Sequence, residues 1–241
     1  ANALDAQAVQ RIFAAKGRPA TSPLIVHVDS VEMARGLVSI WPEAAETLAA
    51  RFWPGPLTLV LPKQPIVPDA VTAGLPTVAV RMPAHPLALE LIRAAGVPVA
   101  APSANPFSGL SPTTAGHVRD SLAGQADLIL DGGPASVGIE STVLSLAASP
   151  PQLLRPGMVS QADIEVLIGP VELAGRIENG AHPSPGMHHR HYSPRTPLIL
   201  VEQGDPLPPG RGVYLAHSAS GHRLMPADPA AYAAALYATL H

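Results

Sequence analysis

Residues 77–105 read TVAVRMPAHPLALELIRAAGVPVAAPSAN and contain the alternation of elements that decides the fold class. The apolar run 77–82 predicts a buried strand, which the following proline closes. A helix is expected over 86–95, because the segment opens with proline and is followed by a glycine suited to a C-terminal cap. The short apolar run 97–101 then predicts a second strand. The stretch therefore indicates a strand–helix–strand unit.

The same alternation continues in both directions along the chain. A helix capped by Asp5 is expected to end near Gly17, and Asp29 with Glu32 predicts a capping box for another helix. Further strands are expected over 24–28, 57–61, 128–130, 142–146 and 152–154, and further helices over 42–52 and from Thr113 or Thr114 to about Gly124. Strands that alternate with helices predict an α/β class, with a twisted, mixed and largely buried sheet flanked by helices.

Composition excludes several classes of protein. The chain has 241 residues, of which 47% are hydrophobic, so it is not disordered. It lacks the ~20 consecutive apolar residues of a membrane span, and polar residues interrupt its first ten positions, so we expect neither membrane association nor a signal peptide. Without cysteine, disulfides and cysteine-bound zinc are impossible, and a reducing, cytoplasmic setting is expected. A net charge of −3 argues against sequence-blind binding of nucleic acid as the main activity.

The pattern changes after Gly169. Residues 170–197 contain glycine, proline and four histidines with little periodicity, which predicts a linker. Strands are then expected over 198–201 and 213–216, followed by a helix that begins at Asp228-Pro229. We predict three parts: a catalytic domain over 1–169, a linker over 170–197 and the beginning of a smaller α/β domain over 198–241.

Three cations stand where a ligand can reach them. Lys16 and Arg18 follow a helix two residues apart, and in an extended stretch both side chains would face one way, which suits a polyphosphate. The alternative is that Lys16 only complements the helix C-terminus. Arg81 ends an otherwise apolar strand, so it meets either a ligand carboxylate or a structural acidic partner.

Hydroxyl and amide side chains gather in the loop after the strand 97–101. Ligands of open α/β sheets bind beyond the carboxyl ends of strands, and such groups bind phosphate or ribose. The loop residues are Ser103, Asn105, Ser108 and Ser111, and Ser141-Thr142 and Arg155 add two further candidates near strand ends. The alternative for the loop is that serine and asparagine only make turns.

No catalytic nucleophile, triad or Walker loop is present, so no catalytic residue is assigned, and transfer chemistry would rest on positioning and charge. A histidine cluster in 170–197 invites a metal hypothesis, but its spacing fits no closed site and favours a polar linker. The cluster comprises His182, His188, His189 and His191.

Seven phrases in one order resemble the YrdC-like family of threonylcarbamoyl-AMP synthases in its longer, two-domain form. They are KGRP (16–19), PLIVH (23–27), FWPGPLT (52–58), VRMP (80–83), APSAN (101–105), EST (140–142) and LRPG (154–157), and SPGMHHRHYSP (184–194) resembles the family linker that settles over the active site. The resemblance covers about residues 1–196 and implies a YrdC-like fold. The family's Thr-x-Thr-x-Tyr-Gly-Leu-Gly-type phrase is absent, so we expect the first strand, part of the threonine pocket and much of the second domain to lie outside this sequence.

The resemblance implies synthesis of L-threonylcarbamoyl-AMP from L-threonine, bicarbonate and ATP, with release of pyrophosphate, for threonylcarbamoyladenosine modification of tRNA. It implies a threonine site of His27, Arg81 and Ser141, and an ATP site of Lys16, Arg18, Ser22, Thr77, Ala101, Ser103, Asn105, Ser111, Arg155 and Tyr192. Ser22 stands where many relatives have asparagine. Mg²⁺ is expected with ATP, with no tightly bound organic cofactor. A contact with tRNA and a downstream tRNA threonylcarbamoyl transferase are the further partners expected.

Two other functions stay open at this point. The first is a non-catalytic module that binds tRNA or double-stranded RNA through Lys16, Arg18, Arg81, Arg155 and Arg190, although the acidic balance argues against it. The second is a related carbamoyl-adenylate domain with another acceptor.

Overall fold

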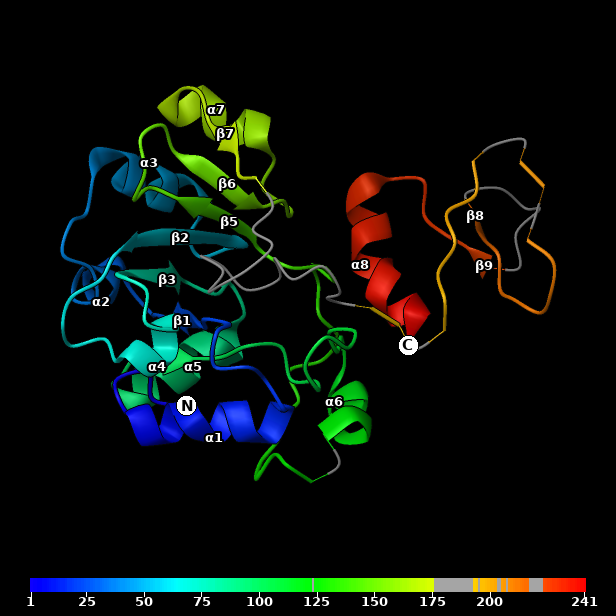
Figure 1. Cartoon of the computed structure of the whole chain (residues 1–241), viewed down its shortest axis with the longest axis horizontal. Helices are drawn as coiled ribbons and strands as arrows, with labels where there is room; N and C mark the ends of the chain where they lie inside the picture. Colours follow the sequence, from blue (N-terminus) through cyan, green and yellow to red (C-terminus); the bar gives the residue numbers. More distant parts are fainter. Residues whose placement is uncertain (123, 176–192, 195, 203–204, 207, 217–222) are drawn as a thin grey trace.

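A mixed seven-stranded sheet forms the centre of the molecule (Figure 1). The computed structural model describes residues 1–122, 124–175, 193–194, 196–202, 205–206, 208–216 and 223–241. The strands lie in the order β4-β1-β3-β2-β5-β6-β7, with bounds β1 Ile25–His27, β2 Leu57–Pro62, β3 Thr77–Arg81, β4 Val99–Ala100, β5 Thr142–Ser145, β6 Gln152–Arg155 and β7 Glu172–Leu173. Three neighbouring pairs are parallel and three antiparallel. The predicted α/β class and mixed sheet are confirmed.

Helices accompany the sheet as the alternation predicts. Their bounds are α1 Ala6–Lys16, α2 Val31–Arg35, α3 Glu43–Phe52, α4 Asp69–Thr72, α5 Pro86–Ala95, α6 Ala115–Leu122 and α7 Gln161–Ile168. Helix α3 packs against α7, and α1 packs against α4. Figure 1 shows α3 and α7 toward the β6–β7 end of the sheet, and α1, α4 and α5 toward the β1–β4 end.

The core is built mainly from aliphatic side chains of the inner strands. Strand β2 is buried from Leu57 to Leu61, because β3 and β5 flank it and helices cover the sheet. The largest fully buried side chains include Leu24, Leu48, Leu57, Leu59, Leu61, Leu144 and Ile164. Aliphatic burial of this extent is the main stabilising contribution to the fold.

Helix α1 forms as predicted and its end shapes the site. The Asp5 carboxylate accepts hydrogen bonds from the amides of Gln7 and Ala8. Gly17 ends the helix in the left-handed region, with φ 59° and ψ 34°. The amide of Arg18 then donates to Phe13 O at 3.0 Å, which closes a Schellman-type cap.

Three local predictions were wrong. Ser30, not Asp29, caps α2, because its hydroxyl accepts from the Met33 amide at 3.2 Å, and no capping box forms with Glu32. The runs 128–130 and 198–201 are irregular, not strands. Among the described residues no neighbouring strand pairs with either run, and their leucines are at least half exposed. An apolar run does not form a strand where no neighbouring strand is available for backbone hydrogen bonds.

Both edges of the sheet are short. On one edge, the backbone of residues 1–3 lies along β4, with Ala100 N donating to Ala1 O and Ala3 N donating to Pro98 O, both at 2.9 Å. On the other, β7 has two residues and follows Pro170. Strand β7 lies inside the predicted linker 170–197, so part of that segment belongs to the sheet.

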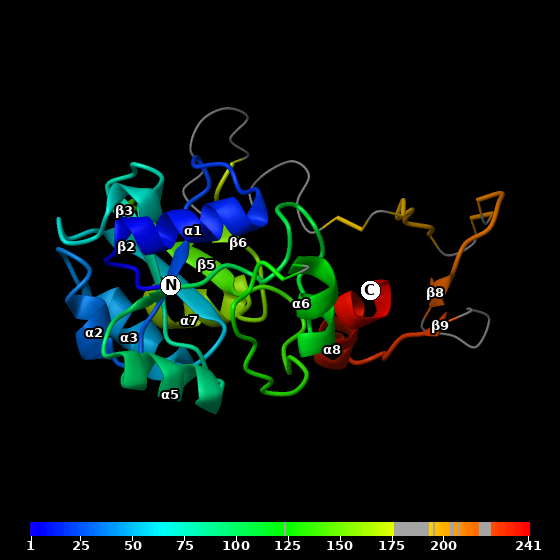
Figure 2. The ribbon, with the colours of Figure 1, turned by 90° about the horizontal axis from the view of Figure 1, so that it is seen from below.

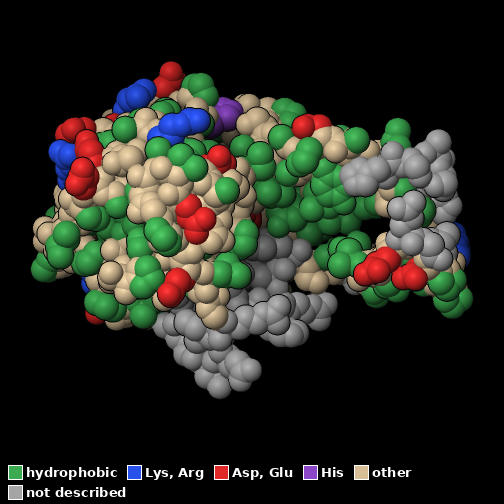
Figure 3. All heavy atoms as spheres, turned by 90° about the horizontal axis from the view of Figure 1, so that it is seen from above, with side chains coloured by type: hydrophobic (Ala, Val, Ile, Leu, Met, Phe, Trp, Pro, Cys, Tyr) green, Lys and Arg blue, Asp and Glu red, His purple; other side chains and the backbone are tan. Residues whose placement is uncertain are grey.

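The C-terminal part lies to one side of the sheet (Figures 1 and 2). It contains the short parallel pair of β8 Leu215–Ala216 with β9 Arg223–Leu224, and α8 Pro229–Leu240. The predicted helix from Asp228 is confirmed, and hydrophobic side chains gather over this part of the surface (Figure 3). Within the described residues, no helix has the length and apolar character to cross a membrane.

Candidate functional site

A cavity of ≈ 370 Å³ opens where several strands begin or end. His27 ends β1, Arg81 ends β3 and Arg155 ends β6, while Glu140 and Ser141 directly precede β5. The loop after β4 and one face of α5 complete the wall. The cavity therefore lies beyond the carboxyl ends of β1 and β3, as expected for a ligand site in an open α/β sheet.

The structure brings together part of the predicted site. The predicted residues that line the cavity are Arg18, His27, Arg81, Ala101, Ser103, Ser141 and Arg155. The others occupy different places: Lys16, Ser22, Asn105 and Ser111 are buried near it, and Thr77 starts β3 at the far end from Arg81. Tyr192 lies outside the described residues, as do Arg190 and the histidines 182, 188, 189 and 191.

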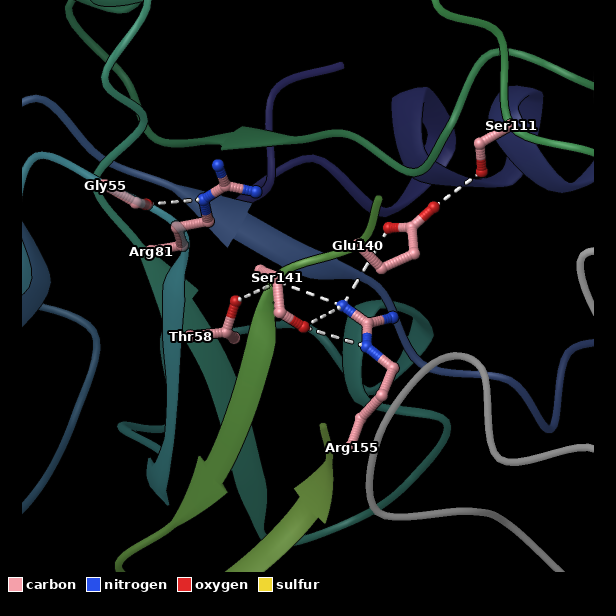
Figure 4. Close-up of polar contacts among 7 residues, drawn as sticks. All are labelled: Gly55, Thr58, Arg81, Ser111, Glu140, Ser141 and Arg155. Carbon is pink, nitrogen blue, oxygen red and sulfur yellow. Dashed lines mark hydrogen bonds and ion pairs between the residues drawn. The ribbon is translucent and has the colours of Figure 1, made fainter. Parts of the chain in front are cut away.

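Arg155 ties two strands together at the cavity wall (Figure 4). Its Nε and Nη2 donate to Ser141 O at 3.0 and 2.8 Å, and Nη2 also donates to Ser141 Oγ at 2.9 Å. Ser141 Oγ lies 2.8 Å from Thr58 Oγ1 at the beginning of β2. Gly157 permits this approach, since a Cβ there would lie 2.4 Å from the Thr142 amide nitrogen. The orientation of Ser141 is thus fixed from two sides.

Arg81 presents the most open cationic group of the cavity. Its Nε donates to Gly55 O at 2.9 Å, which fixes the plane of the guanidinium (Figure 4). Among the described residues, no protein partner is recorded for its two Nη atoms. Burial lowers the pKa of Arg81, with a smaller contribution from Arg155, and Glu140 opposes the shift. A planar guanidinium that is held through Nε, with its Nη donors facing the cavity, suits the binding of a carboxylate.

Lys16 and Arg18 do not converge in the way that the sequence predicted. Because Gly17 is left-handed, the stretch is not extended, and the Lys16 ammonium donates to Ser103 O at 2.5 Å and to Asn105 O. Lys16 thereby holds the loop after β4. Its pKa is lowered to about 8 by burial and by Arg18, with Glu140 opposing. Arg18 does line the cavity, and it donates to the carbonyls of Ser22 and Pro23.

The loop after β4 combines turn-making and ligand-facing groups. Asn105 Nδ2 donates to Pro106 O and Gly109 O, both at 2.9 Å, so this side chain builds the turn, as the alternative reading proposed. Ser103 faces the cavity. Ser22 Oγ, His27 Nδ1 and Asn105 Oδ1 are buried without a hydrogen-bond partner among the described residues. Of these three residues, only His27 lines the cavity.

Glu140 is the site residue that sequence reasoning missed. It is the only acidic side chain among the described residues that line the cavity. Its carboxylate accepts from Ser111 Oγ at 2.5 Å and lies 3.9 Å from Arg155 Nη2 (Figure 4). A charged residue directly before a buried strand was the available signal. Glu140 thus supplies one negative charge among Arg18, Arg81 and Arg155.

Two family models match the chain. The model described as telomere recombination, of Sua5, YciO and YrdC proteins, matches residues 1–157. The chain belongs to this family. A second model, the C-terminal domain of threonylcarbamoyl-AMP synthase, matches residues 159–241, so the chain has the two-domain form that its motifs indicate.

Named relatives agree with this assignment. Threonylcarbamoyl-AMP synthases of Pyrococcus abyssi and Bacillus subtilis are 52% and 51% identical over 84% of the chain. The chain spans 60% and 59% of the length of these two proteins. A crystal structure of P. abyssi Sua5 complexed with L-threonine matches with a TM-score of 0.89 and 41% identity, covering all of this chain and 76% of that one.

His27 gives the structure a pH dependence that can be measured. Burial, and then Arg81, lower its pKa from 6.5 to about 3, so the folded chain binds one proton fewer than the unfolded chain between these values. The contribution of neutral His27 to stability is complete above pH 6.5 and is lost as the pH falls toward 3. We expect the free energy of unfolding of His27→Gln, measured by urea denaturation from pH 8 to 4, to depend less on pH than that of the wild type.

The matched control is His85→Gln at an exposed histidine. It should follow the wild-type pH dependence. Carboxylates titrate in all three proteins, so only the differences between them report on His27. Parallel curves for wild type and His27→Gln would contradict the assignment of a buried neutral imidazole.

Proposed function

We propose that this chain carries the site for synthesis of L-threonylcarbamoyl-AMP from L-threonine, bicarbonate and ATP. The observation that supports this most is the open fork of Arg81 in a cavity that also holds Arg18 and Arg155. The guanidinium of Arg81 fits an amino-acid carboxylate, and those of Arg18 and Arg155 fit phosphates. The relatives named threonylcarbamoyl-AMP synthase and the threonine complex of P. abyssi Sua5 support the same assignment.

The proposed division of the cavity follows from the bonding of each group. Arg81 takes the threonine carboxylate, with Ser141 and the unpartnered Nδ1 of His27 close by. Arg18, Ser103 and Arg155 lie on the nucleotide side. Lys16, Asn105, Ser22 and Ser111 support that side from behind, and Thr77 and Tyr192 stay predictions from the family resemblance.

The reaction needs positioning and charge neutralisation more than a nucleophile of the enzyme. A new N–C bond joins the threonine nitrogen to the bicarbonate carbon, and an oxygen of the resulting carbamate displaces pyrophosphate from the α-phosphorus. The threonine ammonium loses two protons; one leaves in water with a bicarbonate oxygen and the other is released. Arginines fixed by backbone carbonyls need little reorganisation to stabilise the charge of the transition state.

Mg²⁺ is proposed to accompany ATP. The Glu140 carboxylate, which the Ser111 hydroxyl holds at 2.5 Å, is a hard oxygen ligand on the cavity wall and fits a metal that is shared with phosphate. When bound, Mg²⁺ would share the negative charge of the phosphates. Cytoplasmic placement and supply of the product to a tRNA threonylcarbamoyl transferase remain part of the proposal.

An RNA-binding module is less well supported. Lys16, Arg18 and Arg155 are each only 7% exposed, so the phosphates of a duplex cannot reach them.

The deciding experiment measures pyrophosphate release with ATP, Mg²⁺ and bicarbonate, with and without L-threonine, and identifies the adenylate by mass. Threonine-dependent release with that product supports the synthase. RNA affinity with a steep salt dependence and no ATP binding would replace it with the RNA-binding function.

Arg81→Lys tests the carboxylate fork. Lysine keeps the charge but loses the planar pair of donors, and a charged hydrogen bond contributes about 1.5–3 kcal/mol. We expect calorimetry to show threonine binding weakened by about tenfold or more, with ATP affinity changed by less than about twofold. Arg93→Lys, at an exposed position of α5, is the control and should change neither affinity. Equal losses for both ligands in Arg81→Lys would refute the proposed division of the cavity.

Glu140→Gln tests the acidic group. Glutamine still accepts the Ser111 hydrogen bond, but its neutral side chain removes repulsion of ATP and a ligand for Mg²⁺. We expect ATP affinity without Mg²⁺ to rise by a few-fold and the gain in affinity on adding Mg²⁺ to shrink by about tenfold, as measured by calorimetry. Glu90→Gln carries the same charge change on the exposed side of α5 and should behave as wild type. An unchanged Mg²⁺ dependence in Glu140→Gln would remove Glu140 from the metal site.

A further inference from the structure

Helix α8 comes from the C-terminal part of the chain but packs on loops that carry the cavity. Its sequence, PAAYAAALYATL, contains no charged residue, and the Asp228 carboxylate caps it by accepting from Ala231 N at 2.8 Å. Figures 1 and 2 both place α8 on the side of the sheet where α6 lies. An uncharged helix of this kind requires a packing surface.

The first contact is between two backbones. Gly138 has φ +76°, and a Cβ at this position would lie 2.4 Å from both Cα and O of Ala234 and 2.6 Å from Ala233 O. Only glycine leaves room for α8 at this distance. Gly138 also lies two residues before Glu140, so the helix rests on the segment that carries the acidic group of the cavity.

The second contact is at the C-terminal end of α8. His241 Nε2 lies 3.0 Å from Ser111 O, and the His241 ring stacks on His117 of α6 with centroids 4.0 Å apart. Ser111 is the residue whose hydroxyl donates to Glu140. The α8 interface therefore includes Ser111, which bonds the Glu140 carboxylate, and Gly138, which lies two residues before Glu140 in the chain.

Tyr237 lies between these two contacts along α8. The pKa of its phenol is raised to about 12, mainly by burial and also by the charge of Glu140, while Arg155 opposes the shift. The charges of the cavity wall thus act on a side chain of α8. Sequence analysis gave this tyrosine no role.

We propose that α8 is a positioning element for the nucleotide side of the cavity, so that docking of α8 and binding of ATP favour each other. The contacts at Gly138 and Ser111 fix the carboxylate of Glu140, which lies beside Arg155. Linkage requires reciprocity: a nucleotide that binds the docked form better must also stabilise the docking. This inference rests on the proposed nucleotide site, whereas the contacts of α8 do not.

The test compares Gly138→Ala with Gly133→Ala. Gly133 has φ +85° in the same loop, but a Cβ there would meet no atom within 4 Å. Both variants carry the cost of a left-handed alanine, and only Gly138→Ala displaces α8.

Hydrogen exchange of α8 without nucleotide should be about tenfold faster in Gly138→Ala and unchanged in Gly133→Ala. By calorimetry, ATP binding should weaken by about tenfold in Gly138→Ala alone, with threonine affinity within about twofold. In the wild type, ATP should slow exchange in α8.

The two proposals fail in different ways. If wild-type protein binds no ATP, the proposed function fails, and hydrogen exchange without nucleotide still tests the docking. If ATP binds but its affinity falls equally in both glycine variants, or if ATP leaves exchange in α8 unchanged, the positioning role is refuted.

Should Gly138→Ala not fold, His241→Ala removes the ring stack and the Ser111 contact without a clash, and His85→Ala is its control. Unchanged ATP affinity and α8 exchange in His241→Ala would then overturn the proposal.

Discussion

The guanidinium of Arg155 is the group on which the geometry of the cavity depends. It ends β6 and bonds both the backbone and the hydroxyl of Ser141, which precedes β5. Strands β5 and β6 are antiparallel neighbours, so the end of one lies beside the beginning of the other. Through Ser141 the same network reaches Thr58 at the start of β2. Three strands therefore share one polar junction, which fixes the orientation of Ser141 on the cavity wall.

Charge balance explains the remaining arrangement. Four cationic side chains lie in or beside one half-enclosed space, and burial lowers the pKa values of Lys16 and Arg81. Lys16, Arg18, Arg81 and Arg155 each donate to backbone carbonyls, which disperses charge without adding carboxylates. Glu140 is the single acidic group that the described cavity wall contains. A site built this way keeps its cations oriented and leaves most of their charge for an anionic ligand.

Much of this could be predicted from the sequence, for identifiable reasons. Helices such as α1 and α5 follow from caps and apolar spacing, and the residues at strand ends on the cavity wall follow from the alternation of elements. Tertiary context decided the rest. The left-handed Gly17 turned Lys16 onto the loop after β4, which spacing alone does not reveal. The approach of α8 to Gly138 joins positions almost a hundred residues apart, and a glycine in a loop gives no sign of what packs on it.

The two ends of the sheet bear on how the molecule behaves among its own copies. A free sheet edge is a template for intermolecular pairing and aggregation. Here residues 1–3 occupy part of the hydrogen-bonding edge of β4, and β7 is only two residues long with an exposed Glu172 beside Pro170. Within the part of the chain that the structure describes, neither edge offers the long, flat row of donors and acceptors that a second sheet needs. In a protein so rich in aliphatic side chains, the pairing of residues 1–3 with β4 thereby limits strand exchange between molecules along that edge.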